Sequence, residues 1–165
     1  MTHKELGLEI RNILKLAGIK RTDVSVKVSD AGYSTAIHIK IKNPEISRRT
    51  VEDLVKGYNQ VERDEFNGEI LEGANQYLLV EYAYGLFDNV LDEYMETAKK
   101  AINSITSTNA IVKIFDGLLY YQDSRTGAKG VIQEVKNDRC NRTIYSINEL
   151  SEYIYRFVKH GSITA

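Results

Sequence analysis

The chain has 165 residues, of which 42% are hydrophobic and 27% are charged, fractions that are typical of a globular protein and exclude global disorder. Cys140 is the only cysteine, which excludes an internal disulfide and favours a reducing compartment. The net charge of −1 excludes a uniformly basic nucleic-acid-binding chain.

The first predicted element is an amphipathic helix over residues 2–17. Its apolar residues recur at the spacing of one helical stripe, and Gly18 follows as a left-handed stop. The segment is charged and lacks the apolar core of a signal peptide, and no apolar run in the chain approaches the ~20 residues that span a bilayer. We therefore expect a cytoplasmic protein without membrane association.

Residues 24–42 predict a β-hairpin around which the first half of the chain is organised. Apolar and polar residues alternate in two runs, 24–28 and 37–42, on either side of a turn-forming centre at residues 30–32. β-Branched residues with a period of two indicate strands that are buried on one face. The polar face of this hairpin carries Lys27, His38, Lys40 and Lys42.

The hairpin is expected to end at Asn43-Pro44, because proline has no N–H to donate to a neighbouring strand. A second helix is expected to begin at Thr50 and to pack on the same sheet face as the first. A carboxylate-rich loop over residues 62–76 follows, with Asn67-Gly68 as its tightest turn. Residues 76–84 predict a third strand, and the similar apolarity of its two faces predicts that both are covered.

The second half is expected to begin with a long helix over residues 87–105, in which apolar residues form one continuous stripe. A hairpin follows, with strands at residues 110–115 and 118–122. Asp116-Gly117 between these strands predicts a type I′ turn, which needs positive φ at both central residues.

The last predicted elements are two short strands and a helix. The strands are expected at residues 131–136 and 143–145, with Cys140 in the loop between them. Ser146 with Glu149 forms a capping box that opens the last helix, and Gly161 ends it. The inward residues of this helix are expected to be Leu150, Ile154, Phe157 and Val158.

The whole pattern predicts an α+β fold with a mainly antiparallel sheet and helices packed on it. The expected order is α-β-β-α-β-α, followed by a β-hairpin-containing half that ends in a helix. The chain has no linker rich in Pro, Gly or Ser and no internal repeat. We therefore divide it into an α-β-β-α-β unit at residues 1–85 and a second unit at residues 86–165, and expect the two to share one core.

Charge is strongly segmented along the chain. Residues 61–98 carry ten acidic side chains and one basic one, whereas residues 1–60 and 99–165 are each mildly basic. On a helix, residues 88, 92 and 96 form one row with a carboxylate every ~6 Å. Such a surface can bind a basic protein partner, although a solvated helix face beside an acidic loop is the alternative interpretation. The acidic candidates are Glu69, Glu72, Glu81, Asp88, Asp92, Glu93 and Glu96.

Basic and aromatic residues of the second half support an alternative in which the protein binds nucleic acid. Cations contact phosphates, and aromatic rings stack on bases. The competing interpretation is ordinary surface decoration, with tyrosines filling an interface between helices and sheet. The candidates are Lys113, Tyr121, Arg125, Lys129, Lys136, Arg139 and Arg142, with Tyr120 and Tyr145 as further aromatic residues.

No catalytic constellation stands out, so we expect a non-enzymatic protein without a cofactor or metal. The histidines at positions 3, 38 and 160 are scattered and lack metal-ligand spacing. His160 is explained as a cation at a helix C-terminus. Cys140 is flanked by cations that favour its thiolate form, but no histidine base is near it in the sequence. Enzymatic function would require the fold to bring His38 or Cys140 together with distant carboxylates.

A series of structural motifs spans residues 5–84. They comprise Ile10-Arg11 and Leu14-Lys15, residues 24–30, Ile37-His38-Ile39, Phe66-Asn67-Gly68 and Tyr82. Together these motifs resemble the large polyvalent protein associated domain, a small α/β domain of phages, plasmids and integrative elements. The family commonly has a tryptophan and Asp-Gly-Pro where this chain has Lys42-Asn43-Pro44, so only the proline persists.

This resemblance implies that the protein is carried by a mobile genetic element. Small stand-alone proteins of such elements are often inhibitors of host defence that occupy a nuclease or its DNA-binding groove. Joined to the acidic segment, the resemblance predicts an anti-CRISPR or anti-restriction protein, a DNA mimic that inhibits a CRISPR-Cas effector or restriction enzyme of the host by stoichiometric binding. The alternative is a nucleic-acid-binding accessory protein of the element that uses the second half of the chain.

Overall fold

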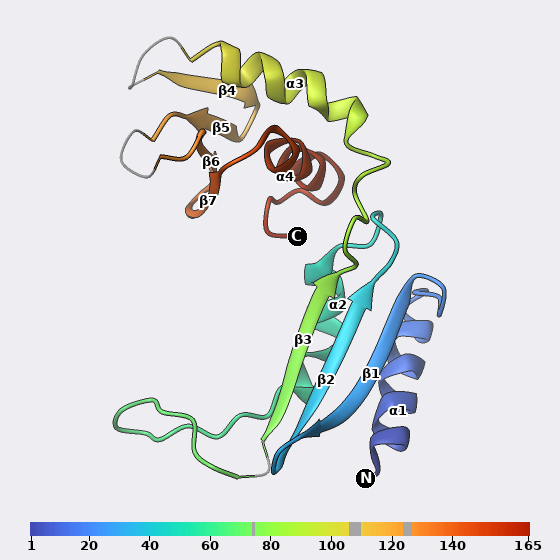
Figure 1. Ribbon diagram of the computed structural model, residues 1–165. Coiled ribbons are helices and arrows are strands. Elements are labelled where there is room, and N and C mark those ends of the chain that lie inside the picture. The colour runs from blue at the N-terminus through green and yellow to red at the C-terminus, as the bar shows by residue number, and fades with distance from the viewer. Residues whose placement is uncertain (74, 106–109, 124–126) are drawn as a thin grey trace. The chain divides into compact units, whose positions relative to one another are not determined.

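The computed structural model describes residues 1–73, 75–105, 110–123 and 127–165. These residues form two compact units, Met1–Leu86 and Phe87–Ala165, each with a sheet of its own (Figure 1). Both the predicted α+β class and the predicted order of elements are confirmed. A core shared by the two units stays a prediction. No helix within the described residues is long and apolar enough to cross a membrane.

The first unit begins with a capped helix and the predicted hairpin. In α1 (His3–Leu16), the Thr2 hydroxyl accepts the N–H of Glu5, and the Glu5 carboxylate accepts the N–H of Thr2. β1 (Val24–Ala31) and β2 (Ser34–Ile41) pair antiparallel around a turn in which Gly32 has a φ of 65°. The alternation of apolar residues is confirmed, since the residues buried on one face of this pair include Val24, Val26, Ile37, Ile39 and Ile41.

The second helix begins earlier than predicted. α2 (Arg48–Val55) starts at Arg48, because Ser47 rather than Thr50 caps it, and the Ser47 side chain accepts the Thr50 N–H. The hydroxyl of Tyr82 fixes the approach to this helix, accepting the Arg48 N–H at 3.0 Å and donating to the Ile46 carbonyl at 3.2 Å. The short helix η1 (Lys56–Tyr58) extends α2 by one turn.

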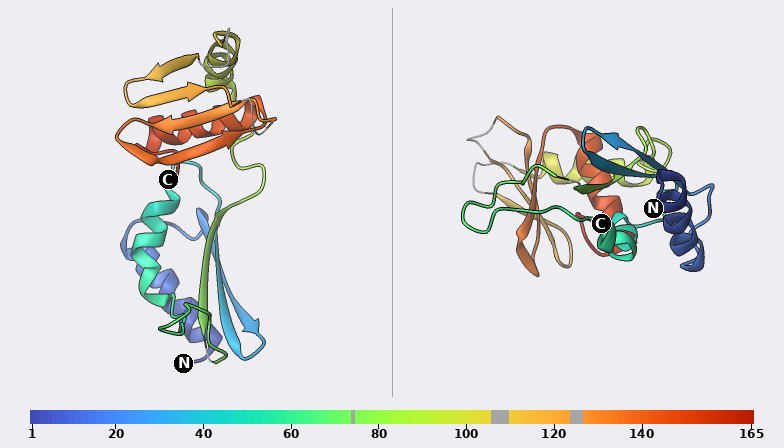
Figure 2. Two further views of the ribbon diagram at one scale, coloured as in Figure 1. Left: turned by 90° about the vertical axis from the view of Figure 1, so that its left-hand side faces the viewer. Right: turned by 90° about the horizontal axis from the view of Figure 1, so that it is seen from below.

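β3 (Gln76–Tyr82) lies parallel to β2 at the edge of the first sheet. α2 supplies the crossover that parallel neighbours require. Both α1 and α2 cover the same face of the sheet, as predicted (Figure 2). The prediction that β3 is covered on both faces is therefore wrong, and Leu79 on its other face is 47% exposed.

The second unit opens with a helix that is shorter than predicted. α3 (Asp92–Asn103) is preceded by turns, in which the Phe87 carbonyl accepts the N–H groups of both Val90 and Leu91. Phe87 and Leu91 are buried without continuing the helix, because tertiary packing rather than helical propensity holds this segment. Asp88 therefore lies in a turn and not on a helix.

The sheet of the second unit contains β4 (Ile111–Phe115), β5 (Leu118–Tyr121), β6 (Gly130–Glu134) and β7 (Asn137–Ile144), paired antiparallel in chain order. The predicted type I′ turn is wrong. Gly117 has a φ of 94°, but among the described residues no non-glycine residue, Asp116 included, has a positive φ. A register shift between Lys113 and Phe115 adjusts the strands to this turn instead. β7 is longer than predicted and places Cys140 in a strand rather than a loop.

The last helix, α4 (Ile147–His160), has the predicted capping box of Ser146 and Glu149 and the predicted stop at Gly161, whose φ is 76°. It packs against α3. The ring of Tyr155 lies 5.5 Å from that of Phe87 and 5.7 Å from that of Tyr94, all three being buried. The prediction that Val158 faces inward is wrong, since it is half exposed and the fully buried stripe ends at Tyr155.

The hydroxyl of Tyr58 joins η1 to α1. It donates to the Glu9 carboxylate at 2.6 Å, and this hydrogen bond is the main cause that raises the pKa of Tyr58 from 10.0 to about 12. Folding thus favours the protonated phenol, a contribution to stability that is present below pH 10 and is lost as the pH rises towards 12.

We predict that Glu9→Gln lowers the pKa of Tyr58, because the carboxylate that accepts the phenol proton is lost. The pKa is measured from the pH dependence of the 13Cζ NMR signal of Tyr58, which is assigned by its absence in Tyr58→Phe. A wild-type Tyr58 that titrates at pH 10 would contradict the geometry.

Candidate functional site

The acidic loop, defined here as residues 61–73, projects from the end of the first sheet at which β3 begins (Figure 1). Its backbone is held as a hairpin by two antiparallel bridges, between Gln60 and Gln76 and between Arg63 and Ile70. At the tip, the Gly68 N–H donates to the Asp64 carbonyl at 3.0 Å, and Gly68 has a φ of 73°. The turn at Asn67-Gly68 therefore lies where the sequence predicts it.

The tip of the acidic loop presents an aromatic ring. The Asp64 carboxylate accepts the N–H of Phe66 at 2.8 Å and the N–H of Asn67 at 3.0 Å, which stabilises the turn at the tip. The side chain of Phe66 is fully exposed, and Ile70 and Leu71 are also exposed. The three exposed apolar side chains belong to one loop, and exposed apolar surface is common where proteins interact.

Asn75 braces the base of the acidic loop. It is 4% exposed, and its amide accepts the Glu62 N–H at 2.8 Å and donates to the Leu71 carbonyl at 2.8 Å. The Asn75 carbonyl in turn accepts the Thr35 N–H of β2 at 2.8 Å. The sequence gives no signal for this function, because an asparagine in a polar loop is ordinary.

The charge of the acidic loop is predominantly negative. Its one cation, Arg63, donates to the Gly68 carbonyl at 3.0 Å and so serves the turn. Within the described part of the chain, no ion pair is formed by Glu65, Glu69 or Glu72. The carboxylates of this loop are those of Glu62, Asp64, Glu65, Glu69 and Glu72.

The structure brings only part of the predicted acidic set together. Glu69 and Glu72 share the acidic loop, whereas Glu81 lies five residues along β3, ~17 Å from its start, and pairs with Lys40 at 3.5 Å. Asp88, Asp92, Glu93 and Glu96 belong to the second unit.

The acidic residues of the second unit form a shorter row than predicted. The prediction that Asp88, Asp92 and Glu96 form one row on a helix is wrong, because Asp88 precedes the helix. Asp92 and Glu93 lie in the first turn of α3, where the helix dipole favours negative charge. Glu96 pairs with Lys99 at 2.8 Å, and this hydrogen bond holds the pKa of Glu96 below its usual value.

The predicted basic set occupies several places in the second unit. Register places Lys113 and Tyr121 on the outer face of the sheet, the one opposite the buried Leu118, Tyr120 and Ile132, and Lys129 continues the same alternation. Arg142 lies on the other face, because it pairs directly with Ile132 and paired residues share a face of the sheet.

The remaining basic candidates add little to that outer face. Lys136 lies in the turn between β6 and β7, Arg139 lies on β7, and Arg125 lies outside the described residues. Tyr120 is fully buried and donates to the Lys129 carbonyl at 2.8 Å, whereas Tyr145 is 62% exposed. The tyrosines thus divide between the core and the surface.

Cys140 belongs to a buried polar cluster that anchors residues 162–165. The Glu134 carboxylate accepts the Ser162 hydroxyl and the Ile163 N–H, both at 2.6 Å. The Cys140 sulfur lies 3.9 Å from the Ser162 hydroxyl and 3.7 Å from that of Thr164. Sequence reasoning did not single out Glu134, whose carboxylate ties the end of the described chain to the sheet.

The histidines lie in separate places. His3 lies 3.5 Å from Asp30, His38 is exposed on the uncovered face of the first sheet, and His160 ends α4. Across the described ranges, no group of three or more His, Cys, Asp or Glu side chains could hold a metal ion.

No known protein family, curated protein or solved structure matches this chain. The resemblance of residues 5–84 to the large polyvalent protein associated domain stays a prediction.

Asn75→Ala tests the brace of the acidic loop. We expect the free energy of unfolding to fall by about 1–3 kcal/mol, because the substitution removes two part-buried hydrogen bonds, each of which contributes about 0.5–1.5 kcal/mol. Urea unfolding measures this change, and hydrogen exchange should accelerate at Glu62. Asn67→Ala, which removes one exposed hydrogen bond to the Glu69 N–H, is the matched control and should cost about 0.5 kcal/mol or less. Equal effects of the two substitutions would contradict the importance of Asn75.

Proposed function

We propose that this protein is a non-enzymatic inhibitor carried by a mobile genetic element, such as a phage or plasmid. It binds a host defence nuclease, a CRISPR-Cas effector or restriction enzyme, and occupies the basic channel meant for nucleic acid. The observation that carries the proposal is the acidic loop, which exposes the carboxylates of Glu65, Glu69 and Glu72 together with the ring of Phe66. The mobile-element origin rests on the resemblance of residues 5–84.

The acidic loop suits insertion into a channel better than imitation of a whole duplex. Duplex DNA carries one charge per ~1.7 Å of its axis, a density that one loop does not reach. A projecting loop can instead place a few carboxylates against cations of the channel while Phe66 supplies apolar contact area. The bridges and the Asn75 brace hold the loop in one conformation before binding, which lowers the entropy cost of association.

A pull-down tests the proposed function. Purified protein is incubated with CRISPR effector nucleases, with and without guide RNA, at low and at high salt. We expect capture of an effector that weakens as salt rises, since opposite charges guide the association. The same preparation should not shift duplex or single-stranded DNA. Failure to capture any effector, together with a DNA shift, would contradict the inhibitor proposal.

Two triple charge reversals identify the surface that is used. Glu65→Lys/Glu69→Lys/Glu72→Lys changes the acidic loop, and Asp92→Lys/Glu93→Lys/Glu96→Lys changes α3 by the same amount of charge. We expect the loop variant to weaken capture of the effector at least tenfold and the helix variant to weaken it less, with circular dichroism confirming that both fold. Unchanged capture by the loop variant would remove the acidic loop from the mechanism, and a loss only with the helix variant would transfer the interface to α3.

A second candidate function is supported by the outer face of the second sheet. Lys113 and Lys129 lie there with the half-buried ring of Tyr121, beside Ile111, which is 66% exposed. Lys113 is paired with Asp116, which reduces the positive charge offered to phosphates. This face supports binding of single-stranded nucleic acid by the second unit.

Fluorescence anisotropy with a labelled single-stranded DNA tests the second candidate. If it holds, Lys129→Glu should weaken binding at least threefold and flatten the salt dependence, because one phosphate contact is lost. Arg142→Glu, on the opposite face of the sheet, is the control that should change neither by as much. Equal losses in the two variants would indicate non-specific attraction and contradict a site on the outer face.

A further inference from the structure

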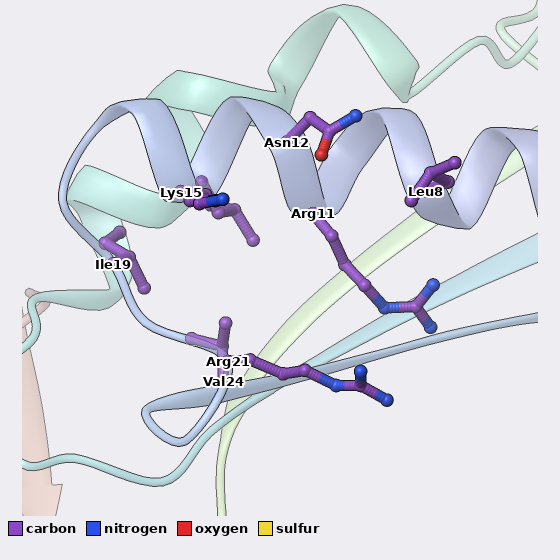
Figure 3. Close-up of a pocket in the computed structure, with 8 residues that line it drawn as sticks. Leu8, Arg11, Asn12, Lys15, Ile19, Arg21 and Val24 are labelled. Atoms are coloured by element: carbon purple, nitrogen blue, oxygen red, sulfur yellow. The ribbon is translucent and has the colours of Figure 1, made fainter.

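A cavity of about 200 Å³ lies between α1 and the start of β1, at the free edge of the first sheet (Figure 3). Its apolar wall includes Leu14, Ile19 and Val24. Three cationic side chains also line it, those of Arg11, Lys15 and Arg21, and none of its lining residues is acidic. The cavity thus combines an apolar wall with a positive rim.

Arg11 is held in place by its surroundings. Its guanidinium donates to the Val26 carbonyl of β1 at 2.6 Å, which satisfies a backbone acceptor of an edge strand. A Cβ on Gly7 would come within 3.3 Å of the Arg11 guanidinium, so the glycine leaves room for this group. The single bond to Val26 leaves further N–H groups of the guanidinium able to donate to a ligand.

Arg21 approaches the same cavity from the segment before β1. Figure 3 shows the guanidinium groups of Arg11 and Arg21 extending in the same direction from the two sides of the cavity. Like charges that line one small cavity repel each other, and an oxyanion between them relieves the repulsion. Within the described residues, no ion pair is formed by Arg11, Lys15 or Arg21.

We propose that this cavity is a binding site for a small organic acid with an apolar body. The carboxylate contacts the guanidinium groups of Arg11 and Arg21, whose planar donors match carboxylate geometry. The apolar body lies against Leu14, Ile19 and Val24. The volume is below the ~300–1,000 Å³ of sites for drug-sized ligands, which restricts the ligand to the size of a simple aromatic or branched aliphatic acid.

The site is independent of the proposed inhibitor function. The acidic loop leaves η1 and returns to β3, whereas the cavity is lined by α1 and the segment that leads into β1. Neither Glu69 nor Glu72 lines the cavity. Ligand binding can therefore be measured without a nuclease and judged without reference to inhibition.

Titration of the 15N-labelled full chain with phenylacetate, followed by 1H–15N NMR, tests the proposal. Phenylacetamide has the same shape without the charge, and inorganic phosphate supplies an oxyanion without the apolar body. We expect saturable shifts at residues 7–26 with phenylacetate, and at least tenfold weaker binding of both other probes. Arg21→Ala should weaken phenylacetate binding at least fivefold. Lys20→Ala, an adjacent cation outside the cavity, should change it less than twofold.

Several results would overturn the proposal. The absence of saturable shifts would show that the cavity holds no such acid. Equal binding of phenylacetamide would show that the cations do not recognise the ligand. Equal binding of phosphate would show that the site binds anions in general. Equal losses in Arg21→Ala and Lys20→Ala would indicate bulk electrostatic attraction. Arg11→Lys, which keeps the charge but not the planar fork, should weaken binding, and full retention would also contradict the assigned geometry.

Discussion

Burial of one face of β2 determines the organisation of the first unit. Ile37, Ile39 and Ile41 are completely buried there, at the centre of a core that α1 and α2 close from the same side. Complete burial of each such side chain contributes about 1.5–3 kcal/mol, so a one-residue slip of register would expose all three at a large cost. The opposite face, the edge of β1 and the loop before β3 are thereby left available for interactions.

The acidic loop and the cationic cavity both depend on this one-sided arrangement. The loop connects α2, on the covered face, to the edge strand β3, and its carboxylates stay solvated because they lie beyond the sheet. Repulsion between exposed carboxylates is modest, about 1 kcal/mol for two charges 4 Å apart in water. In the proposed complex, cations of the partner would offset that repulsion, and in the chain alone Asn75 and the bridges hold the loop at its base.

The sequence predicted correctly those features that depend on residues close together in the chain. Ser146 and Glu149 cap α4 as expected, because both partners of the capping box lie within one turn. The predicted start of α2 at Thr50 was wrong, because Ser47 caps the helix and the hydroxyl of Tyr82, more than thirty residues away, also binds the backbone at Ile46 and Arg48. The prediction that Cys140 lies in a loop was also wrong. The charged residues around it show no alternation of apolar and polar side chains, and pairing with β6 makes that segment a strand.

The candidate sites also differ in how far the sequence could predict them, according to whether their residues are close in the chain. The sequence predicted an acidic loop with Glu69 and Glu72, since carboxylates and turn formers are local signals. It could not predict that Asn75 braces this loop, nor that the fold brings Arg11 and Arg21 into one cavity, because those contacts join separate elements.

Photo-crosslinking from the tip of the acidic loop tests the central claim most directly. The variant Phe66→p-benzoylphenylalanine is mixed with a nuclease that the wild-type protein inhibits, irradiated, and analysed by mass spectrometry. We predict an adduct with residues of the nucleic-acid channel of the nuclease, and competition by its guide RNA or DNA target. An inhibited nuclease that gives no adduct from position 66, but does give one from position 92 of α3, would contradict the claim that the acidic loop enters the channel.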